Sequence, residues 1–236
     1  MFVDYPLHKL PNAQKKKDDS YFKKVFTIGV IFCGFSFIYW QLNKLGYLPP
    51  ISYFLSKNNN LSSWQLSTTR DDLLNYDRAV KDLITLPIDK SQTKILIQKS
   101  QYRLTLYYQK QPIKSYPVVF GSNPVGDKFK EGDRKTPEGI FKVRDLYPHA
   151  QWSKFIWLDY PNHDSWQKHL QAKKLGKISR FDSIGSEIGI HGVPKNRDSM
   201  IDQGLNWTWG CISLKNQDVD ELYSVIQVGT AIQINP

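Results

Sequence analysis

Cysteine is scarce in this sequence, with two residues, Cys33 and Cys211, in a chain of 236. That count excludes a small disulfide-stabilised scaffold, because such folds need several cysteine pairs. Cys33 lies inside a long apolar run, so we expect no bridge between the two cysteines. A metal site is not indicated either, since one cysteine and scattered histidines match no standard zinc spacing. Cys211 is therefore a lone thiol, either reactive or inert and buried.

Acidic residues are also in deficit, with 22 Asp and Glu against 32 Lys and Arg, a formal net charge of +10. This charge suits negatively charged surroundings such as a membrane surface, an anionic wall polymer or nucleic acid. The chain lacks zinc-finger spacing, a basic zipper and an RNA-binding aromatic signature, and its basic residues are spread along its length. We therefore expect no nucleic-acid partner.

One long stretch has no charge. From Val25 to Asn43 there are 19 uncharged residues, close to the roughly 20 needed to span the ~30 Å hydrocarbon core as a helix. Lysines 15, 16, 17, 23 and 24 precede the run, and fewer positive charges follow it. The positive-inside rule then places the N-terminus in the cytoplasm. No Ala-x-Ala site follows, which favours an anchor over a cleaved signal peptide.

These features predict a basic cytoplasmic tail (1–24) and a single transmembrane anchor (25–45) in the inner, cytoplasmic membrane. The rest of the chain would be extracytoplasmic, in the periplasm. Residues 46–90 have the texture of a stalk, with the break Pro49-Pro50 and a polar run after it. Apolar residues recur there at helical spacing until Pro87 ends the pattern, which predicts one stalk helix. They are Leu73, Tyr76, Val80, Leu83 and Ile84.

Residues 91–236 form the remaining domain, where the pattern changes to β. Apolar residues alternate with polar ones from Ile95 to Phe120, which predicts a meander of antiparallel strands. Further strands are expected at 139–143, 155–159, 187–191, 211–214 and 230–234. A C-terminal helix is indicated by Asn216 as N-cap, acidic residues in the first turn and an apolar stripe. The domain is predicted to be mainly β with one or two helices.

The stretch that suggests chemistry runs from His191 to Cys211. A short apolar strand ends at His191, an irregular loop follows, and Gly210-Cys211 opens another apolar strand. A nucleophilic cysteine needs a nearby base, because a free thiol is mostly protonated at neutral pH. A glycine before it lets backbone N–H groups point at an oxyanion. However, a single histidine at a strand end is more often structural, and a single cysteine is often a small core side chain. Spacing by itself leaves the two readings open.

Three separated motifs resemble the L,D-transpeptidase (YkuD-like) family. In that family a His-Gly pair is followed, after a loop, by Ser/Thr-x-Gly-Cys. Here His191 is followed by 16 residues and then by Thr208-Trp209-Gly210-Cys211. The segment GDRKTPEGIFKV (132–143) resembles a second family motif, and Tyr160-Pro161-Asn162 resembles a third. The resemblance covers residues 93 to 235.

This resemblance implies a β-sandwich-like domain that acts on peptidoglycan stem peptides without metal or cofactor. Cys211 would be the nucleophile, His191 its base, and the Gly192 carbonyl would orient the imidazole. The N–H groups of Gly210 and Cys211 would form the oxyanion hole. Weaker candidates for substrate binding are Thr208, Trp209 and Arg134.

The chain departs from the family pattern at two positions. Trp209 stands where many members have His, and Ser213 stands where they have Arg or Asn. An indole cannot accept a proton, so a second imidazole role is lost. The expected function is transfer of a stem peptide to an amine. The open alternatives are a hydrolase of the same fold and an inactive wall-binding module. Papain-like enzymes have the opposite order of Cys and His, and a sortase needs an Arg after its Cys, which this chain lacks.

Overall fold

The computed structural model describes Ser36, Gln41 and residues 73–84 and 87–236. The predicted anchor and most of the predicted stalk lie outside this part, apart from Ser36 and Gln41, which are both helical. Within the described residues, no helix has the length and hydrophobicity needed to cross a membrane.

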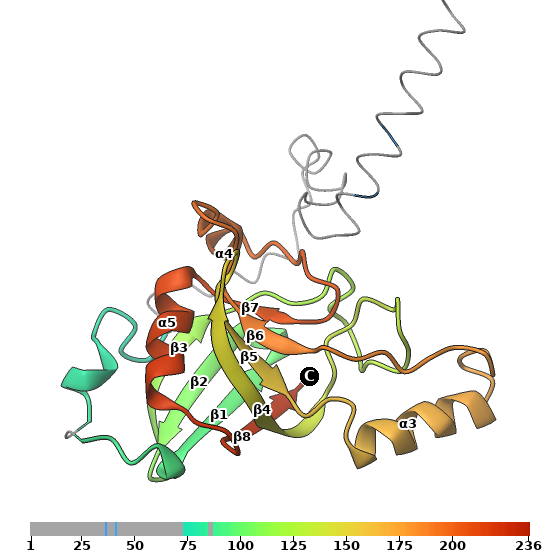
Figure 1. Cartoon of the computed structure of the whole chain (residues 1–236), viewed down its shortest axis with the longest axis horizontal. Coiled ribbons are helices and arrows are strands. Elements are labelled where there is room, and N and C mark those ends of the chain that lie inside the picture. Colours follow the sequence, from blue (N-terminus) through green and yellow to red (C-terminus); the bar gives the residue numbers. More distant parts are fainter. Residues whose placement is uncertain (1–35, 37–40, 42–72, 85–86) are drawn as a thin grey trace, which may run out of the picture. The chain divides into compact units, whose positions relative to one another are not determined.

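The domain is built on one eight-stranded sheet, shown in Figure 1. Its strands are β1 (Thr93–Gln98), β2 (Arg103–Tyr108), β3 (Gln111–Pro117), β4 (Gly139–His149), β5 (Ser153–Leu158), β6 (Gly189–His191), β7 (Ile212–Ser213) and β8 (Ala231–Asn235). Their order across the sheet is β3-β2-β1-β8-β4-β5-β6-β7. The antiparallel meander predicted from Ile95 onward is confirmed by β1, β2 and β3.

The sheet curls, because the chain after β3 returns to the strand at the opposite edge. Val119 pairs with Ser213 of β7, and Gly121 pairs with Thr208. The eight strands thus form one continuous sheet rather than two stacked ones, so the mainly β prediction is confirmed in the form of a curled sheet. The main core includes alternate residues of the strands, such as Leu104, Ile156 and Ile190, as expected where one face of a sheet is buried.

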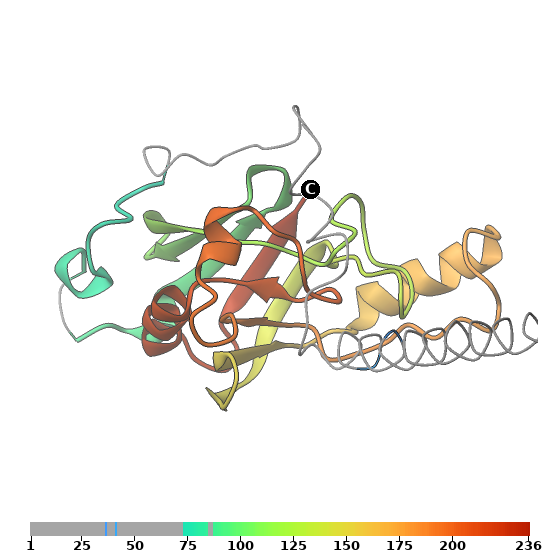
Figure 2. The same cartoon turned by 90° about the horizontal axis from the view of Figure 1, so that it is seen from above.

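Three α-helices accompany the sheet in the described residues. They are α3 (His163–Lys174), α4 (Ser199–Asp202) and α5 (Asn216–Val225). Helix α5 contributes Val219, Leu222 and Val225 to the main core. Helix α3 extends away from the sheet in both views (Figures 1 and 2). The sequence analysis missed it, although Asn162 caps it by accepting a hydrogen bond from the Ser165 N–H.

The described part of the predicted stalk packs on the domain. Val80 and Ile84 are buried in the main core. The predicted α-helix is wrong here: residues 73–84 form turns and a short 3₁₀ helix, η3 (Val80–Asp82). Tertiary hydrogen bonds replace the helical ones, because Ser115 N–H donates to the Leu74 carbonyl and Asn75 Nδ2 donates to Ile113.

Two further 3₁₀ turns flank the first strand, η4 (Lys90–Gln92) before β1 and η5 (Lys99–Gln101) after it. Lys99 is buried at the start of η5. Its ammonium donates to the carbonyls of Gly126 and Thr136 and pairs with Glu138 at 2.7 Å. This lysine therefore fastens the long loop between β3 and β4 to the sheet.

Candidate active site

His191 and Cys211 lie on neighbouring strands. Strands β6 and β7 are parallel, and the core residues Ile190 and Ile212 are partners in their register. His191 follows the first of these residues, and Cys211 precedes the second. Because successive side chains of a strand point to opposite faces, both side chains face away from the main core, on the same side of the sheet.

The His191 ring is buried in an aromatic cage. Trp152 stacks on it with ring centroids 4.4 Å apart, Phe155 lies nearly parallel to it at 5.7 Å, and Trp207 meets its edge at 5.5 Å. Trp152 comes from the turn between β4 and β5, and Phe155 from β5. The sequence analysis had no signal for Phe155 at this place. The cage fixes the plane of the imidazole.

A backbone carbonyl determines which nitrogen of His191 carries the proton. His191 Nδ1 lies 2.7 Å from the Gly192 oxygen. A carbonyl oxygen can only accept, so Nδ1 carries the hydrogen and Nε2 of the neutral ring has a free lone pair. Burial lowers the pKa of His191 to about 4, against the opposing effect of the Gly192 hydrogen bond, with a further lowering by His149. The ring is therefore neutral at pH 7 and able to accept a proton.

Cys211 is a partly buried free thiol. Its Sγ donates to the Glu187 carbonyl at 3.6 Å. Burial raises the pKa of Cys211 to about 11, although the Gly189 backbone and the Lys128 charge act in the opposite direction. The resting pair is then a neutral thiol and a neutral imidazole. Such a cysteine attacks only as its proton leaves, which requires a base in the site.

The turn before Cys211 needs its glycine. Gly210 has φ +140, and a Cβ there would lie 2.8 Å from the Lys135 carbonyl and 2.9 Å from Ile188 Cδ1. Thr208 shapes the same turn: its Oγ1 donates to the Cys211 carbonyl at 2.7 Å and accepts from the Gly210 N–H at 3.2 Å. Of the two N–H groups expected in the oxyanion hole, that of Gly210 is thus engaged within the turn.

Arg134 and Trp209 lie together beside this turn. The Arg134 guanidinium carbon is 5.6 Å from the centre of the Trp209 ring, a cation–π distance, and Trp209 is 45% exposed. Arg134 comes from the long loop between β3 and β4, whose Lys135 carbonyl also meets Gly210. The structure thus brings two of the three weaker binding candidates, Arg134 and Trp209, close to each other and next to Gly210-Cys211.

The loop that carries Arg134 is tied by Asp133. This carboxylate accepts from the N–H groups of Phe129, Lys130 and Lys135 and pairs with Lys128 at 2.8 Å. Burial opposes its ionisation, yet these bonds hold the pKa of Asp133 below its usual value. Lys128 is itself buried. The loop beside the thiol is therefore well ordered by its own charges.

Two other histidines, His169 and His149, have structural positions. His169 is buried in α3 and its Nδ1 lies 2.6 Å from the Phe129 carbonyl, while His149 stacks on Trp152 at 4.4 Å. Among the described residues, no group of three His, Cys, Asp or Glu side chains is placed to hold a metal ion.

Known proteins resemble part of the chain. It is 27% identical over 138 residues to YafK of Escherichia coli K12, a match covering 56% of the chain and 46% of YafK. The chain thus spans about half the length of the curated relatives it matches. Two solved structures match part of the chain: Pgp2, a helical cell shape determining protein of Campylobacter jejuni (22% identity, TM-score 0.46), and Bd1075 of Bdellovibrio bacteriovorus (21% identity, TM-score 0.44). Both matches cover 61% of this chain, with 47% of Pgp2 and 48% of Bd1075.

The family-level comparison covers more than half of the chain. The model of the YkuD family, described as the L,D-transpeptidase catalytic domain, matches residues 92–234. This range contains all eight strands of the sheet except Asn235, the last residue of β8. It also contains both His191 and Cys211. The chain therefore belongs to the L,D-transpeptidase catalytic domain family.

Proposed function

We propose that this protein is a peptidoglycan L,D-transpeptidase that forms a Cys211 thioester with a stem peptide and transfers the peptide to an amine. One observation supports it most: the Gly192 carbonyl holds the His191 proton on Nδ1, which leaves Nε2 as a base on the face of the sheet that carries Cys211. Membership of the family supplies the substrate class.

The proposed reaction begins with attack of Cys211 on the carbonyl carbon between the third and fourth residues of the stem. The thiol proton passes to His191 Nε2 as the C–S bond forms. The oxyanion accepts a hydrogen bond from the Cys211 N–H, while Thr208 keeps the preceding turn in shape. The intermediate then breaks its C–N bond, and the proton on Nε2 goes to the departing D-alanine amine.

The second half of the reaction reverses these steps. An acceptor amine attacks the thioester carbon and gives its proton to His191 Nε2. The C–S bond breaks, and the proton returns to sulfur. Arg134, stacked on Trp209 beside the thiol, is proposed to bind a carboxylate of the stem peptide, because a guanidinium pairs well with that group.

The alternative is hydrolysis of the same thioester by water, as a carboxypeptidase or endopeptidase. Trp209 carries the case for this alternative, since it replaces a histidine common in the family and is 45% exposed. Trp207 argues for transfer, because it is nearly buried against His191, where it helps to exclude water.

The decisive assay supplies tetrapeptide muropeptides to the full chain, with and without a D-amino acid or a second stem as acceptor. Exchanged or cross-linked products that increase with acceptor concentration support transfer. Tripeptides alone, at every acceptor concentration, identify a hydrolase. An inactive wall-binding module would give neither product, and its thiol would not react with a thiol-reactive β-lactam.

Cys211→Ala is the control for this assay. We expect the variant to lose all turnover while its unfolding free energy changes by no more than about 1 to 2 kcal/mol, since a single small side chain is lost. Thermal unfolding of the two proteins measures the second quantity. Turnover by a folded Cys211→Ala variant would contradict the nucleophile assignment.

The location of the enzyme is a separate proposal. The uncharged run from Val25 to Asn43 and the lysines before it support a single-pass anchor with the catalytic domain in the periplasm. A reporter active only outside the cytoplasm, fused after residue 236, should be active. If a reporter fused at the same position is instead active in the cytoplasm, this topology is wrong. The catalytic domain would then lack access to peptidoglycan.

A further inference from the structure

The peptide unit after His191 is held by three segments from outside its own loop. The Gly192 N–H donates to the Trp152 carbonyl at 3.0 Å, in the turn between β4 and β5. The Val193 N–H donates to Asn216 Oδ1 at 3.1 Å, at the start of α5. The Gly192 carbonyl accepts from Ser213 Oγ at 3.2 Å, in β7. The orientation of this carbonyl therefore depends on hydrogen bonds to three other segments of the chain.

Ser213 is fully buried and is the register partner of His191. Its backbone is fixed as well, because its N–H and carbonyl both bond to Val119. The hydroxyl is the donor to Gly192, since a carbonyl can only accept. The Gly192 oxygen thus uses both of its lone pairs, one for His191 Nδ1 and one for Ser213 Oγ. This serine occupies the position where many family members have a larger Arg or Asn.

Asn216 also holds the loop after His191 through a direct hydrogen bond. The sequence analysis expected it to cap the C-terminal helix, but Lys215 is the N-cap residue, and the Asn216 N–H donates to Asp198 Oδ1 at 3.0 Å. Asn216 is the first helical residue, and its amide oxygen reaches back to the Val193 N–H. A Cβ on Gly192 would lie only 2.1 Å from that oxygen. The expected capping contact has been exchanged for one that holds the loop after His191.

A neutral imidazole can place its proton on either nitrogen, and the environment decides which. Here the cage fixes the ring plane, and the Gly192 carbonyl is the acceptor that favours Nδ1–H. If this carbonyl turns away, the preference weakens and part of the population carries its proton on Nε2. That form has no free lone pair on Nε2.

We propose that Ser213 and Asn216 are positioning residues that keep the Gly192 carbonyl directed at His191 and thereby hold the imidazole in its Nδ1–H tautomer. The catalytic consequence rests on the proposed function, in which Nε2 takes the Cys211 proton. The structural consequence, the tautomer itself, does not depend on any activity.

The tautomer is measured by ¹⁵N NMR of the histidine rings in the full chain, with His191 assigned by its absence from His191→Gln. Wild type at pH 7 should show a protonated Nδ1 and an unprotonated Nε2. Ser213→Val should shift both signals toward a mixture, whereas Ser213→Thr, of nearly the same shape but with a hydroxyl, should retain the wild-type pattern. Asn216→Ala should also give a mixture, and Asn216→Asp, which keeps an acceptor oxygen, should not.

The matched control is Ser115→Ala. This serine is also buried, and its hydroxyl bonds to Thr105 Oγ1 at 2.9 Å in the β2–β3 pair. Its replacement should leave the His191 signals unchanged. A wild-type tautomer pattern in both Ser213→Val and Asn216→Ala would overturn the proposal. Equal shifts in Ser213→Thr and Ser213→Val would also overturn it, because the hydroxyl would then be irrelevant.

Acylation of Cys211 by a β-lactam gives a second readout. We expect the rate to fall about tenfold in Ser213→Val relative to Ser213→Thr, the size of effect that follows from losing one ordinary hydrogen bond to the base's orienting group. If muropeptides are not substrates at all, the NMR result still stands, so failure of the proposed function and failure of this inference are distinguishable.

Discussion

Helix α5 takes part in two buried polar clusters that are constructed differently. Its first residue, Asn216, belongs to the site cluster, in which His191, Gly192 and Ser213 are held by uncharged groups. Further along, Asp218 and Glu221 belong to a second cluster, the clasp, with Tyr76, Lys114 and Tyr116. The site cluster keeps its titratable group neutral, whereas the clasp contains paired charges.

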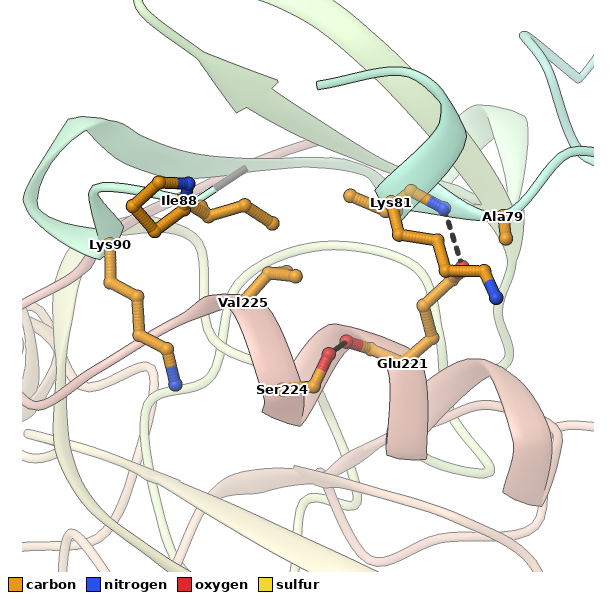
Figure 3. A pocket seen from close by; sticks show the side chains of 9 residues that line it. Ala79, Lys81, Ile88, Lys90, Glu221, Ser224 and Val225 are labelled. Atoms are coloured by element: carbon orange, nitrogen blue, oxygen red, sulfur yellow. Dashed lines mark hydrogen bonds between the residues drawn. The ribbon is translucent and has the colours of Figure 1, made fainter. Parts of the chain in front are cut away.

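The clasp fastens residues 73–84 to the domain. Glu221 accepts from the Val80 N–H at 2.7 Å and from Tyr116 at 2.8 Å, and it pairs with Lys114 at 2.8 Å. Lys114 also donates to the Arg78 carbonyl. Figure 3 shows Glu221 reaching from α5 toward this segment, at the edge of a pocket that Ile88, Lys90 and Val225 also line.

The two clusters show that burial can have two different effects on polar side chains. In the clasp, burial strengthens ion pairs and joins a segment to the core, because charges attract more strongly away from water. In the site cluster, burial lowers the pKa of His191 to about 4 and keeps the imidazole uncharged as a base. The four predictions below disturb each cluster in turn.

The largest effect is expected for Gly192→Ala. Its Cβ would lie 2.1 Å from Asn216 Oδ1 and 2.6 Å from the Trp152 carbonyl, so two of the three contacts that hold this peptide must move. We expect the unfolding free energy to fall by about 3 kcal/mol and β-lactam acylation to fall at least about a hundredfold, a barrier change of roughly 3 kcal/mol. Denaturant titration and acylation kinetics measure the two quantities.

Gly204→Ala is the control for this change. A Cβ there meets nothing within 4 Å, although φ is +61, so a loss near 1 kcal/mol from backbone strain is expected, with acylation unchanged. Equal effects of the two substitutions would show that the contacts of Gly192 are unimportant.

Glu221→Gln should destabilise the fold by about 2 kcal/mol, because it leaves the buried Lys114 ammonium without its partner. Acylation of Cys211 should be unaffected, since the clasp holds a different part of the chain. Adding Lys114→Met to Glu221→Gln should recover part of the loss. If the double variant is as unstable as Glu221→Gln, the charge pair does not account for the effect.

Asp218→Asn should raise the unfolding free energy at pH 7 by about 1 kcal/mol. Burial raises the pKa of Asp218 to about 6, against the effect of the Tyr76 hydrogen bond. A carboxyl with a raised folded pKa stabilises the fold fully below its unfolded pKa of about 4, and this stabilisation is lost as pH rises through about 6. Unfolding measured from pH 4 to 8 tests the sign: the gain of the variant should vanish at the acid end.

The smallest effect concerns the pH dependence of acylation, which should be nearly flat between about pH 7.5 and about 5.5. With a folded pKa of about 4, His191 stays neutral throughout this range. A histidine with an ordinary pKa of about 6.5 would lose most of its free base over the same interval. A steep decline of the acylation rate through pH 6.5 would therefore contradict the neutral, buried base.

Sequence patterns predicted the local parts of this molecule well. Alternation located the strands, and the spacing of His191, Gly210 and Cys211 led to the family. Helix α5 was also predicted, but the role of Asn216 was not, because the hydrogen bond to Val193 depends on how two distant segments pack. The same limit applies to Trp152 and Phe155, which reach His191 only through the pairing of β5 with β6.

The two remaining errors have the same cause. Residues 73–84 have helical spacing, but the Leu74 carbonyl accepts from the Ser115 N–H and the Asn75 side chain donates to the Ile113 carbonyl, so turns replace the helix. Helix α3 lacks a clear apolar stripe, with Trp166 and Leu170 exposed, so its cap at Asn162 was the only signal. In both places tertiary contacts, which a linear pattern does not contain, decide the local structure.

Strand β8 is the last strand in chain order, yet it lies in the middle of the sheet, parallel to β1 and antiparallel to β4. During synthesis, the meander β1–β3 and the strands β4–β7 therefore exist before the element that joins them. Pairings of such high sequence separation form slowly. The nascent domain has two unsatisfied sheet edges until β8 is made, and these edges are the sites where a chaperone would need to act.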